Sequence, residues 1–217
     1  MSTELLDQLW VSFYQTIWMV AVAGGIGTLI GLPIGIFLYI TDKSSFLPMP
    51  RLNSIVGLCV NILRSVPFII LLFAVTGFTR FIVGTSIGTA AAIVPLTIAV
   101  APFIGRIVEA SLREVPYGLI EAAQSMGATN VQIIRKVLIP EALPGIISGL
   151  TLSAIALIGY SAMAGAVGGG GLGDLAINYG YYRYNNTVSW IVVVVLVVMV
   201  QAIQSAGDSL IRRISHK

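Results

Sequence analysis

The sequence is poor in charge, in cysteine and in histidine, and each shortage excludes a class of protein. Only 10% of the 217 residues are charged, 57% are hydrophobic, and the mean hydropathy is +0.95. Because soluble domains carry about a quarter charged residues, this composition excludes an ordinary water-soluble enzyme. Cys59 is the single cysteine and His216 the single histidine. The chain therefore has no internal disulfide and no cluster of cysteine and histidine ligands for a metal.

The few charges are unevenly spaced and leave long apolar segments between them. Five segments of 24 to 34 residues carry at most one charge: residues 8–41, 52–79, 81–105, 142–173 and 184–207. About 20 apolar helical residues cross the hydrocarbon core of a bilayer, so each segment is long enough to do so. Strands of a membrane barrel would alternate apolar and polar residues, whereas residues 191–200 are apolar throughout. The sequence predicts an all-α integral membrane protein with five transmembrane helices.

The distribution of lysine and arginine predicts the orientation of these spans. The spans are expected at about residues 14–40, 55–77, 84–104, 146–167 and 187–207, and together they make up a membrane domain of residues 14–207. One alternating set of connecting segments contains nine lysines and arginines, and the other contains only Arg80 and Arg183. Positive charge favours the cytoplasmic side, so residues 1–13 are expected outside and the tail 208–217 in the cytoplasm. The net charge of +3 is explained by this orientation, and no nucleic-acid partner is expected.

The N-terminal residues indicate that the first span is retained in the mature protein. The first ten residues contain no lysine or arginine, so we expect the first helix to insert the chain and not to be removed as a signal peptide.

Residues 105–143, on the predicted cytoplasmic side, hold 8 of the 21 charged residues. Arg106, Glu109 and Arg113 are spaced to share one helical face, which predicts an ordered segment.

Two short helices are predicted within this cytoplasmic segment. The first covers residues 119–126 and is closed by Gly127, because glycine readily adopts the left-handed conformation that ends helices. The second covers residues 130–138, with Thr129 as its N-cap, and is expected to stop before Pro140. Two short helices on the cytoplasmic face of a membrane protein indicate a docking surface for a soluble protein.

A short motif in this segment consists of Glu121, Ala122, Ala123, Gly127 and Pro140. It resembles the EAA loop of the permease subunits of bacterial ABC importers. Val137 and Ile139 stand where that family usually has isoleucine and leucine. The resemblance implies a coupling helix that sits in a groove of a separate ATP-hydrolysing subunit, and it makes the five motif residues candidates for coupling to the ATPase. The alternative is that Ala122 and Ala123 only pack inside a helical hairpin.

Three further stretches carry a second resemblance: residues 61–72, 83–112 and 159–185. They resemble the permease of methionine ABC importers, and the overall similarity extends over about residues 31–208. The resemblance implies that residues 14–207 form a type I importer permease domain in the bacterial cytoplasmic (inner) membrane. It implies a homodimer of this subunit, two copies of a cytoplasmic ABC ATPase, and an extracytoplasmic methionine-binding protein, often lipid-anchored. The substrates would be L- and D-methionine, and another amino acid or small polar solute is the alternative.

The chain has no recognisable ATP site of its own. It lacks the G-x-x-x-x-G-K-[ST] motif, and its glycine-rich run, residues 168–171, is followed by Asp174 where a phosphate loop would have lysine. ATP and Mg are therefore expected in the partner ATPase, and we expect no catalytic residue, bound cofactor or metal here. The glycine run predicts a flexible turn between the fourth and fifth spans. Alternatively, it lets those helices rearrange or offers backbone to the external binding protein.

Four residues are candidates for the translocation pathway or its gate: Arg64, Pro67, Tyr160 and Met163. A charge within a span is costly, so Arg64 either contacts substrate or pairs with backbone carbonyls at a kink near Pro67. Small residues surround Tyr160 and Met163, which indicates close helix packing. Met163 is the long flexible side chain of that run and either packs there or closes the pathway across a twofold axis.

Two other function classes are poorly supported by the sequence. A secondary transporter commonly has ionisable residues near mid-membrane and inverted repeats, whereas Arg64 stands alone and no repeat is apparent. An intramembrane enzyme would need a histidine, an acid pair or a metal set beside a serine such as Ser65, Ser153 or Ser161, and the spans contain none.

Overall fold

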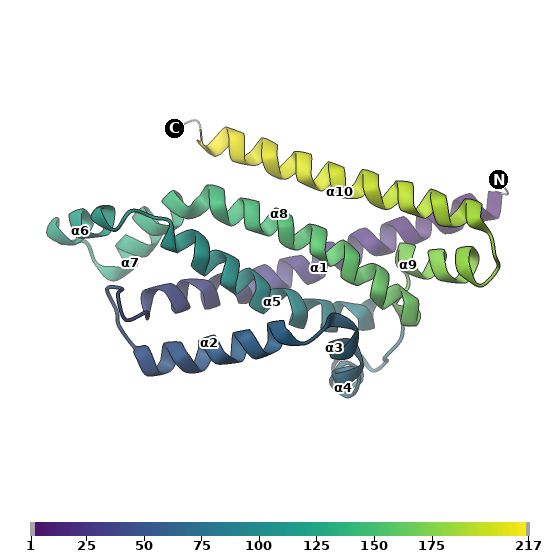
Figure 1. Cartoon of the computed structure of the whole chain (residues 1–217), viewed down its shortest axis with the longest axis horizontal. Coiled ribbons are helices and arrows are strands. Elements are labelled where there is room, and N and C mark those ends of the chain that lie inside the picture. Colours follow the sequence, from purple (N-terminus) through teal and green to yellow (C-terminus); the bar gives the residue numbers. More distant parts are fainter. Residues whose placement is uncertain (1–2, 216–217) are drawn as a thin grey trace.

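The structure, a computed structural model, describes residues 3–215, which form an elongated bundle of helices without a strand among them (Figure 1). The long helices are α1 (Thr3–Ile40), α2 (Pro50–Ser65), α5 (Thr89–Arg113), α8 (Ile139–Ala164) and α10 (Asn186–Ser215). The shorter ones are α3 (Phe68–Ala74), α4 (Thr76–Val83), α6 (Tyr117–Ser125), α7 (Asn130–Ile133) and α9 (Gly171–Leu175), with π-helical turns at Ile134–Leu138, Gly165–Gly169 and Ala176–Tyr181. The all-α prediction is confirmed.

Four helical segments of the described chain are long and apolar enough to cross a membrane. They are Glu4–Ile40, Thr89–Arg113, Asn130–Gly169 and Asn186–Ile214. α2 and α3 together pass the same test but are bent by 103°, so the total is five if this bent pair counts as one span. The ends of the chain lie at opposite ends of the bundle, as an odd number of spans requires (Figure 1). Which end faces the cytoplasm remains a prediction.

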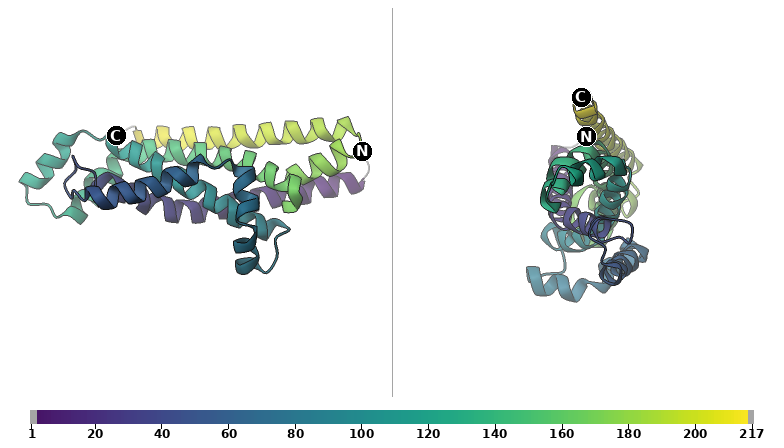
Figure 2. Two further views of the ribbon diagram at one scale, coloured as in Figure 1. Left: turned by 60° about the horizontal axis from the view of Figure 1, so that its bottom comes forward. Right: turned by 90° about the vertical axis from the view of Figure 1, so that its left-hand side faces the viewer.

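The second span is a bent pair and not one straight helix over residues 55–77. Helix α2 ends at Ser65, and Val66 is extended (φ −82°, ψ 123°). Proline disfavours helical geometry in the residue before it, so Pro67 accounts for the break. The two views of Figure 2 show that α3 and α4 project away from the bundle axis beyond this break.

Helices α1 and α5 pack against each other through a row of glycines. Gly27, Gly31 and Gly35 are four residues apart on α1 and face α5. A Cβ atom on Gly31 would lie 2.6 Å from the carbonyl oxygen of Ala101, and one on Gly35 would lie 2.5 Å from that of Gly105. Small residues allow such backbone contact between helices, and this contact forms the centre of the bundle.

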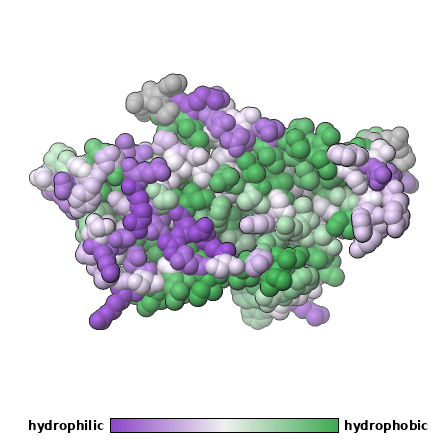
Figure 3. Space-filling view, viewed as in Figure 1, coloured by the Kyte–Doolittle hydropathy of each residue, from purple (hydrophilic) through white to green (hydrophobic). Residues whose placement is uncertain are grey.

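Apolar side chains cover much of the outside of the bundle. Leu29, Leu58 and Val198, on three different helices, expose 76%, 59% and 61% of their surface. Figure 3 shows hydrophobic surface over the middle of the molecule, with hydrophilic residues gathered toward the end that carries α6 and α7. A helix that is apolar on its outer side as well as in the core is suited to a lipid environment.

The helix predicted over residues 130–138 does not stop before Pro140. It continues through the π-helical turn Ile134–Leu138 into α8, where Pro140 lies in the first turn. Proline lacks an amide donor, and its ring clashes with the carbonyl group four residues earlier. A wider π-helical turn directly before Pro140 explains how the helix accommodates the proline, so the sequence-based end of this helix was wrong.

The glycine-rich run is not an open turn. Gly168, Gly170 and Gly171 have φ values of +77° to +87°, which only glycine adopts readily. The amide of Gly171 donates to Oε1 of Gln15 (2.8 Å), and the amide of Leu172 donates to Oγ1 of Thr16 (2.9 Å). The run therefore leads α9 back onto α1, and the expected flexible turn is corrected to a packed, hydrogen-bonded one.

Candidate functional site

The predicted coupling segment is an ordered unit at one end of the bundle. Helix α6 begins after Pro116 and ends at Ser125, close to the predicted residues 119–126. Gly127 has φ +78°, and the amide of Ala128 donates to the carbonyl of Ala123 (3.0 Å), which closes the helix. These observations confirm Gly127 as the residue that ends the first short helix.

The N-cap predicted at Thr129 is also confirmed. The amide of Gln132 donates to Oγ1 of Thr129 (3.4 Å), and the amide of Thr129 donates to Oε1 of Gln132 (2.8 Å). This reciprocal capping box satisfies two amides at the start of α7 and fixes the turn between α6 and α7.

Helix α6 divides the motif residues between a buried and an exposed face. Ile120 and Ala123 are buried against the core, whereas Glu121 and Ala122 are exposed. Ala123 thus fits the alternative in which the alanine packs inside the segment, while Glu121 and Ala122 are available to a partner. Pro140 is exposed but lies at the start of α8, apart from the α6 helix.

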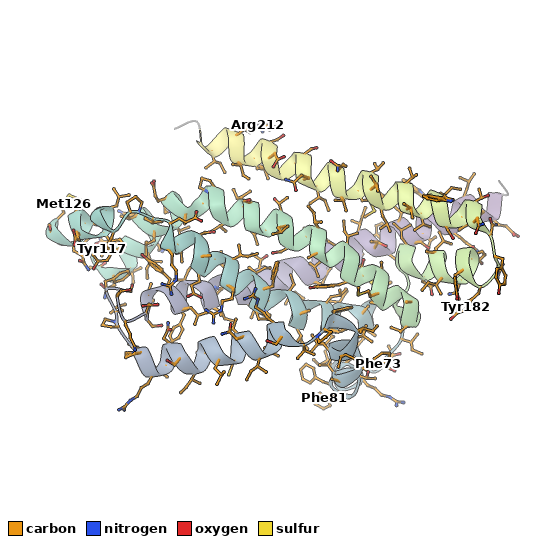
Figure 4. All side chains as sticks on the ribbon, viewed as in Figure 1. Phe73, Phe81, Tyr117, Met126, Tyr182 and Arg212 are labelled. Atoms are coloured by element: carbon orange, nitrogen blue, oxygen red, sulfur yellow. The ribbon has the colours of Figure 1, made fainter. Side chains whose placement is uncertain are left out.

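Exposed apolar side chains that the sequence did not reveal lie on α6 and directly after it. Tyr117, Leu119, Met126 and Val131 expose 47%, 41%, 81% and 62% of their surface. Figure 4 shows Tyr117 and Met126 at the same end of the molecule, beyond the long helices. The signal in the sequence was Met126 directly before the glycine that ends α6, a position where a helix end leaves its side chain in the open.

An ion-pair network lies next to this segment and unites the three residues predicted to share a face of α5. Glu109 accepts from Nη1 of Arg106 (2.6 Å) and from Nη2 of Arg113 (2.8 Å). Arg113 also donates to Oδ2 of Asp42 (2.6 Å), in the loop between α1 and α2. Nη2 of Arg106 donates to the backbone carbonyl of Gly57 in α2 (2.9 Å). The network therefore joins α5, α2 and the α1–α2 loop.

The ion pair of Asp42 with Arg113 persists at neutral pH. The hydrogen bond from the Arg113 guanidinium holds the pKa of the Asp42 carboxyl below its ordinary value. A depressed carboxyl pKa means that the stabilisation is present above the unfolded-state pKa and is lost as the pH falls through the folded-state pKa. The pair therefore stays ionised throughout the physiological range.

The pathway candidates lie near the bend between α2 and α3. Arg64 is exposed in the last turn of α2, with its guanidinium carbon 5.7 Å from the centre of the Phe103 ring. Pro67 caps α3, and the next residue, Phe68, stacks on Tyr160 of α8 at 4.8 Å and 13°. The structure thus brings Pro67 and Tyr160 together through Phe68.

The end of the small-residue run in the fourth span packs within the chain. A Cβ atom on Gly165 would lie 2.5 Å from the amide nitrogen of Asp174, and one on Gly173 would overlap the backbone of Ala162. This part of the run therefore holds α9 against the end of α8. Met163 is different, because 49% of its surface is exposed.

The Tyr160 stack is expected to stabilise the bent span. Tyr160→Ala removes the ring that contacts Phe68, and we expect a loss of at least about 0.5–1.5 kcal/mol, the contribution of an aromatic pair beyond its buried area. The midpoint of thermal unfolding of the purified protein in detergent measures the loss. Tyr160→Phe keeps the stack and is the control; if both variants melt alike, the stack contributes nothing.

Comparison with known families identifies the kind of protein. The profile described as "Binding-protein-dependent transport system inner membrane component" matches residues 31–216. The chain belongs to this family. It is therefore a multi-pass inner-membrane permease subunit of an ABC importer, and ATP hydrolysis belongs to a separate subunit of such an importer.

Individual relatives cover nearly the whole chain. The probable D-methionine transport system permease protein MetI of Vibrio cholerae is 55% identical over 211 residues, 97% of this chain and 94% of the relative. The methionine import system permease protein MetP of Bacillus subtilis is 47% identical over 94% of this chain and 91% of the relative. A solved subunit of the MetNI methionine ABC transporter, from a study of its inward-facing conformations, is 52% identical, with a TM-score of 0.97 over 99% of both chains.

Proposed function

We propose that this permease translocates methionine, in its L- and D- forms, into the cell as the membrane subunit of an ATP-driven importer. The observation that carries the proposal is similarity along the whole chain to permeases named for methionine transport, at 55% and 48% identity. The similarity includes the bend between α2 and α3 and the end of α8, where the candidate pathway residues lie, and is not limited to the α6 segment.

We further propose the assembly in which the chain works. Two copies form the membrane channel, and each binds one ATPase subunit, which uses ATP and Mg, through the exposed face of α6 with Glu121 and Ala122. Exposed apolar side chains beside that face, Met126 above all, support a protein partner, since this end lies beyond the long apolar helices. An extracytoplasmic methionine-binding lipoprotein delivers substrate at the opposite end, where the N-terminus lies.

The pathway is proposed to run along the bent α2–α3 segment and the end of α8. Arg64 is exposed at the bend, lies over the face of Phe103 and forms no ion pair within the described chain, so its charge is available to a second copy or to substrate. Met163 is half-exposed on α8, which supports a gate formed with its copy in the partner subunit. Gly127 and Pro140 shape the coupling segment and do not contact substrate in this proposal.

Uptake by a reconstituted transporter tests the function. Proteoliposomes contain this chain, its ATPase and its binding protein, and they receive radiolabelled L-methionine with ATP on the ATPase side. We expect accumulation that requires ATP and that excess unlabelled D- or L-methionine inhibits. Accumulation of another amino acid in preference to methionine would overturn the substrate assignment.

A further inference from the structure

The buried carboxylate of Glu109 lies where three parts of the permease meet. Only 6% of the residue's surface is exposed, although carboxylates are seldom buried unless paired. Its two oxygens bind two different arginines, Arg106 through Oε2 and Arg113 through Oε1. One side chain thus fixes both arginines of the α5 face at once.

Each arginine in turn holds an element other than α5. Arg106 donates to the carbonyl of Gly57, in the middle of α2. The contact is close, since a Cβ atom added to Gly57 would lie 3.2 Å from Nη2 of Arg106. Arg113 holds Asp42 of the α1–α2 loop, which also binds the amide of Ser44.

The coupling helix is attached to the same end of α5. Only residues 114–116 separate α5 from α6, and Val115 within this link is buried. A cavity of about 400 Å³ lies between the start of α6 and the α1–α2 loop, lined by Tyr117 on one side and Ser45 on the other. Beside that space, the ion pair of Asp42 with Arg113 joins the loop to the end of α5 that leads to α6.

A continuous set of contacts therefore runs from α6 to the bend in the second span. It passes from the end of α5 through Glu109 and Arg106 to Gly57 on α2, and α2 leads to Arg64 and the break at Pro67. Buried pairs of this kind hold their geometry more firmly than exposed ones, because an unpaired charge in the interior is costly.

We propose that Glu109 is a positioning residue for energy coupling. Its carboxylate holds α5, α2 and the α1–α2 loop as one unit, so that displacement of α6 by the ATPase moves α2 and its bend. The inference rests on the importer function proposed above and names residues that act at a distance from both substrate and ATPase.

Two variants of different severity test the proposal in the complete transporter. Glu109→Gln keeps the shape of the side chain and removes its charge, and Asp42→Asn does the same at a more exposed position, where misfolding is less of a risk. Arg51→Gln is the control, because Arg51 is an exposed cation in the first turn of α2 at the same end of the bundle.

The first readout is methionine transported per ATP hydrolysed, normalised to assembled complex. We expect Glu109→Gln and Asp42→Asn to hydrolyse ATP at the native rate while transport per ATP falls by about 2- to 30-fold, the range seen along coupled networks. The double variant is expected to resemble the more severe single variant, because both changes act on one network. Arg51→Gln is expected to match the native transporter.

The second readout reports α2 directly and does not need substrate. Cys59 is the single cysteine of the chain and is exposed on α2, two residues from Gly57. With cysteine-free ATPase subunits, spin labels on the two copies of Cys59 report their distance with and without ATP. We expect an ATP-dependent change in the native complex and a smaller change in Glu109→Gln.

The outcomes separate this inference from the proposed function. A native complex that fails to accumulate methionine refutes the substrate, while the Cys59 distances still decide the role of Glu109. The inference is overturned if the native distance is insensitive to ATP or if the variants keep native transport per ATP and native distance changes. A loss of hydrolysis and transport in proportion to lost complex also overturns it, because Glu109 would then serve stability alone.

Discussion

Gly31→Leu is expected to drive α1 away from α5 and to destabilise the whole permease. Even the first atom of a side chain at this position would lie 2.6 Å from the carbonyl oxygen of Ala101 and 2.8 Å from Cβ of Ile104. The oxygen belongs to the backbone of α5 and Cβ is fixed to it, so no side-chain rotation relieves the overlap. Overpacking costs about 1–3 kcal/mol where neighbours can adjust, and we expect a loss at or above the upper end.

The same helix supplies a matched control for this prediction. A Cβ atom on Gly25 would have no neighbour within 4 Å, and Gly25 is exposed. Gly25→Leu therefore adds the same side chain to the same helix without the overlap. The midpoint of thermal unfolding and the yield of monodisperse protein in detergent are the measurements. Equal midpoints for the two variants would show that α1 and α5 do not meet through Gly31.

The number and position of the membrane spans could be predicted from the sequence because they follow from the distribution of charged residues. A charged side chain in the bilayer is costly, so uncharged segments mark spans regardless of how the helices pack. Four of the five predicted segments correspond to long helices, and the fifth corresponds to α2 and α3. The coupling segment was also predictable, since Gly127 and Thr129 act through local backbone geometry and need no distant partner.

The features that the sequence did not reveal depend on contacts between distant residues. The charge pattern placed Arg113 on one face with Glu109, but its second partner, Asp42, is 71 residues away. The glycine run was expected to be flexible because nothing in the sequence indicates that Gln15 and Thr16 bind its amides. Proline misled the prediction at Pro140, where a π-helical turn lets the helix continue.

Gly127→Val is expected to uncouple the permease from its ATPase and to abolish most methionine uptake. Gly127 has φ +78°, and a Cβ atom there would meet nothing within 4 Å, so the effect is one of backbone strain and not of crowding. The left-handed conformation costs an L-residue about 1–2 kcal/mol, and this shifts the population of the native turn by about 5- to 30-fold. A shifted turn tilts α6 and its exposed Glu121 relative to the bundle.

Asparagine at the same position separates strain from every other effect of the substitution. Asparagine is close to valine in size but visits the left-handed conformation routinely, so Gly127→Asn is expected to keep most uptake. Membrane insertion should be equal in both variants, because Gly127 lies in the turn between α6 and α7 and outside the long helices. ATP-dependent uptake, together with co-purification of the ATPase, measures the effect. If valine and asparagine reduce uptake equally, the turn geometry at Gly127 does not control coupling, and contact of the glycine itself with the ATPase becomes the explanation.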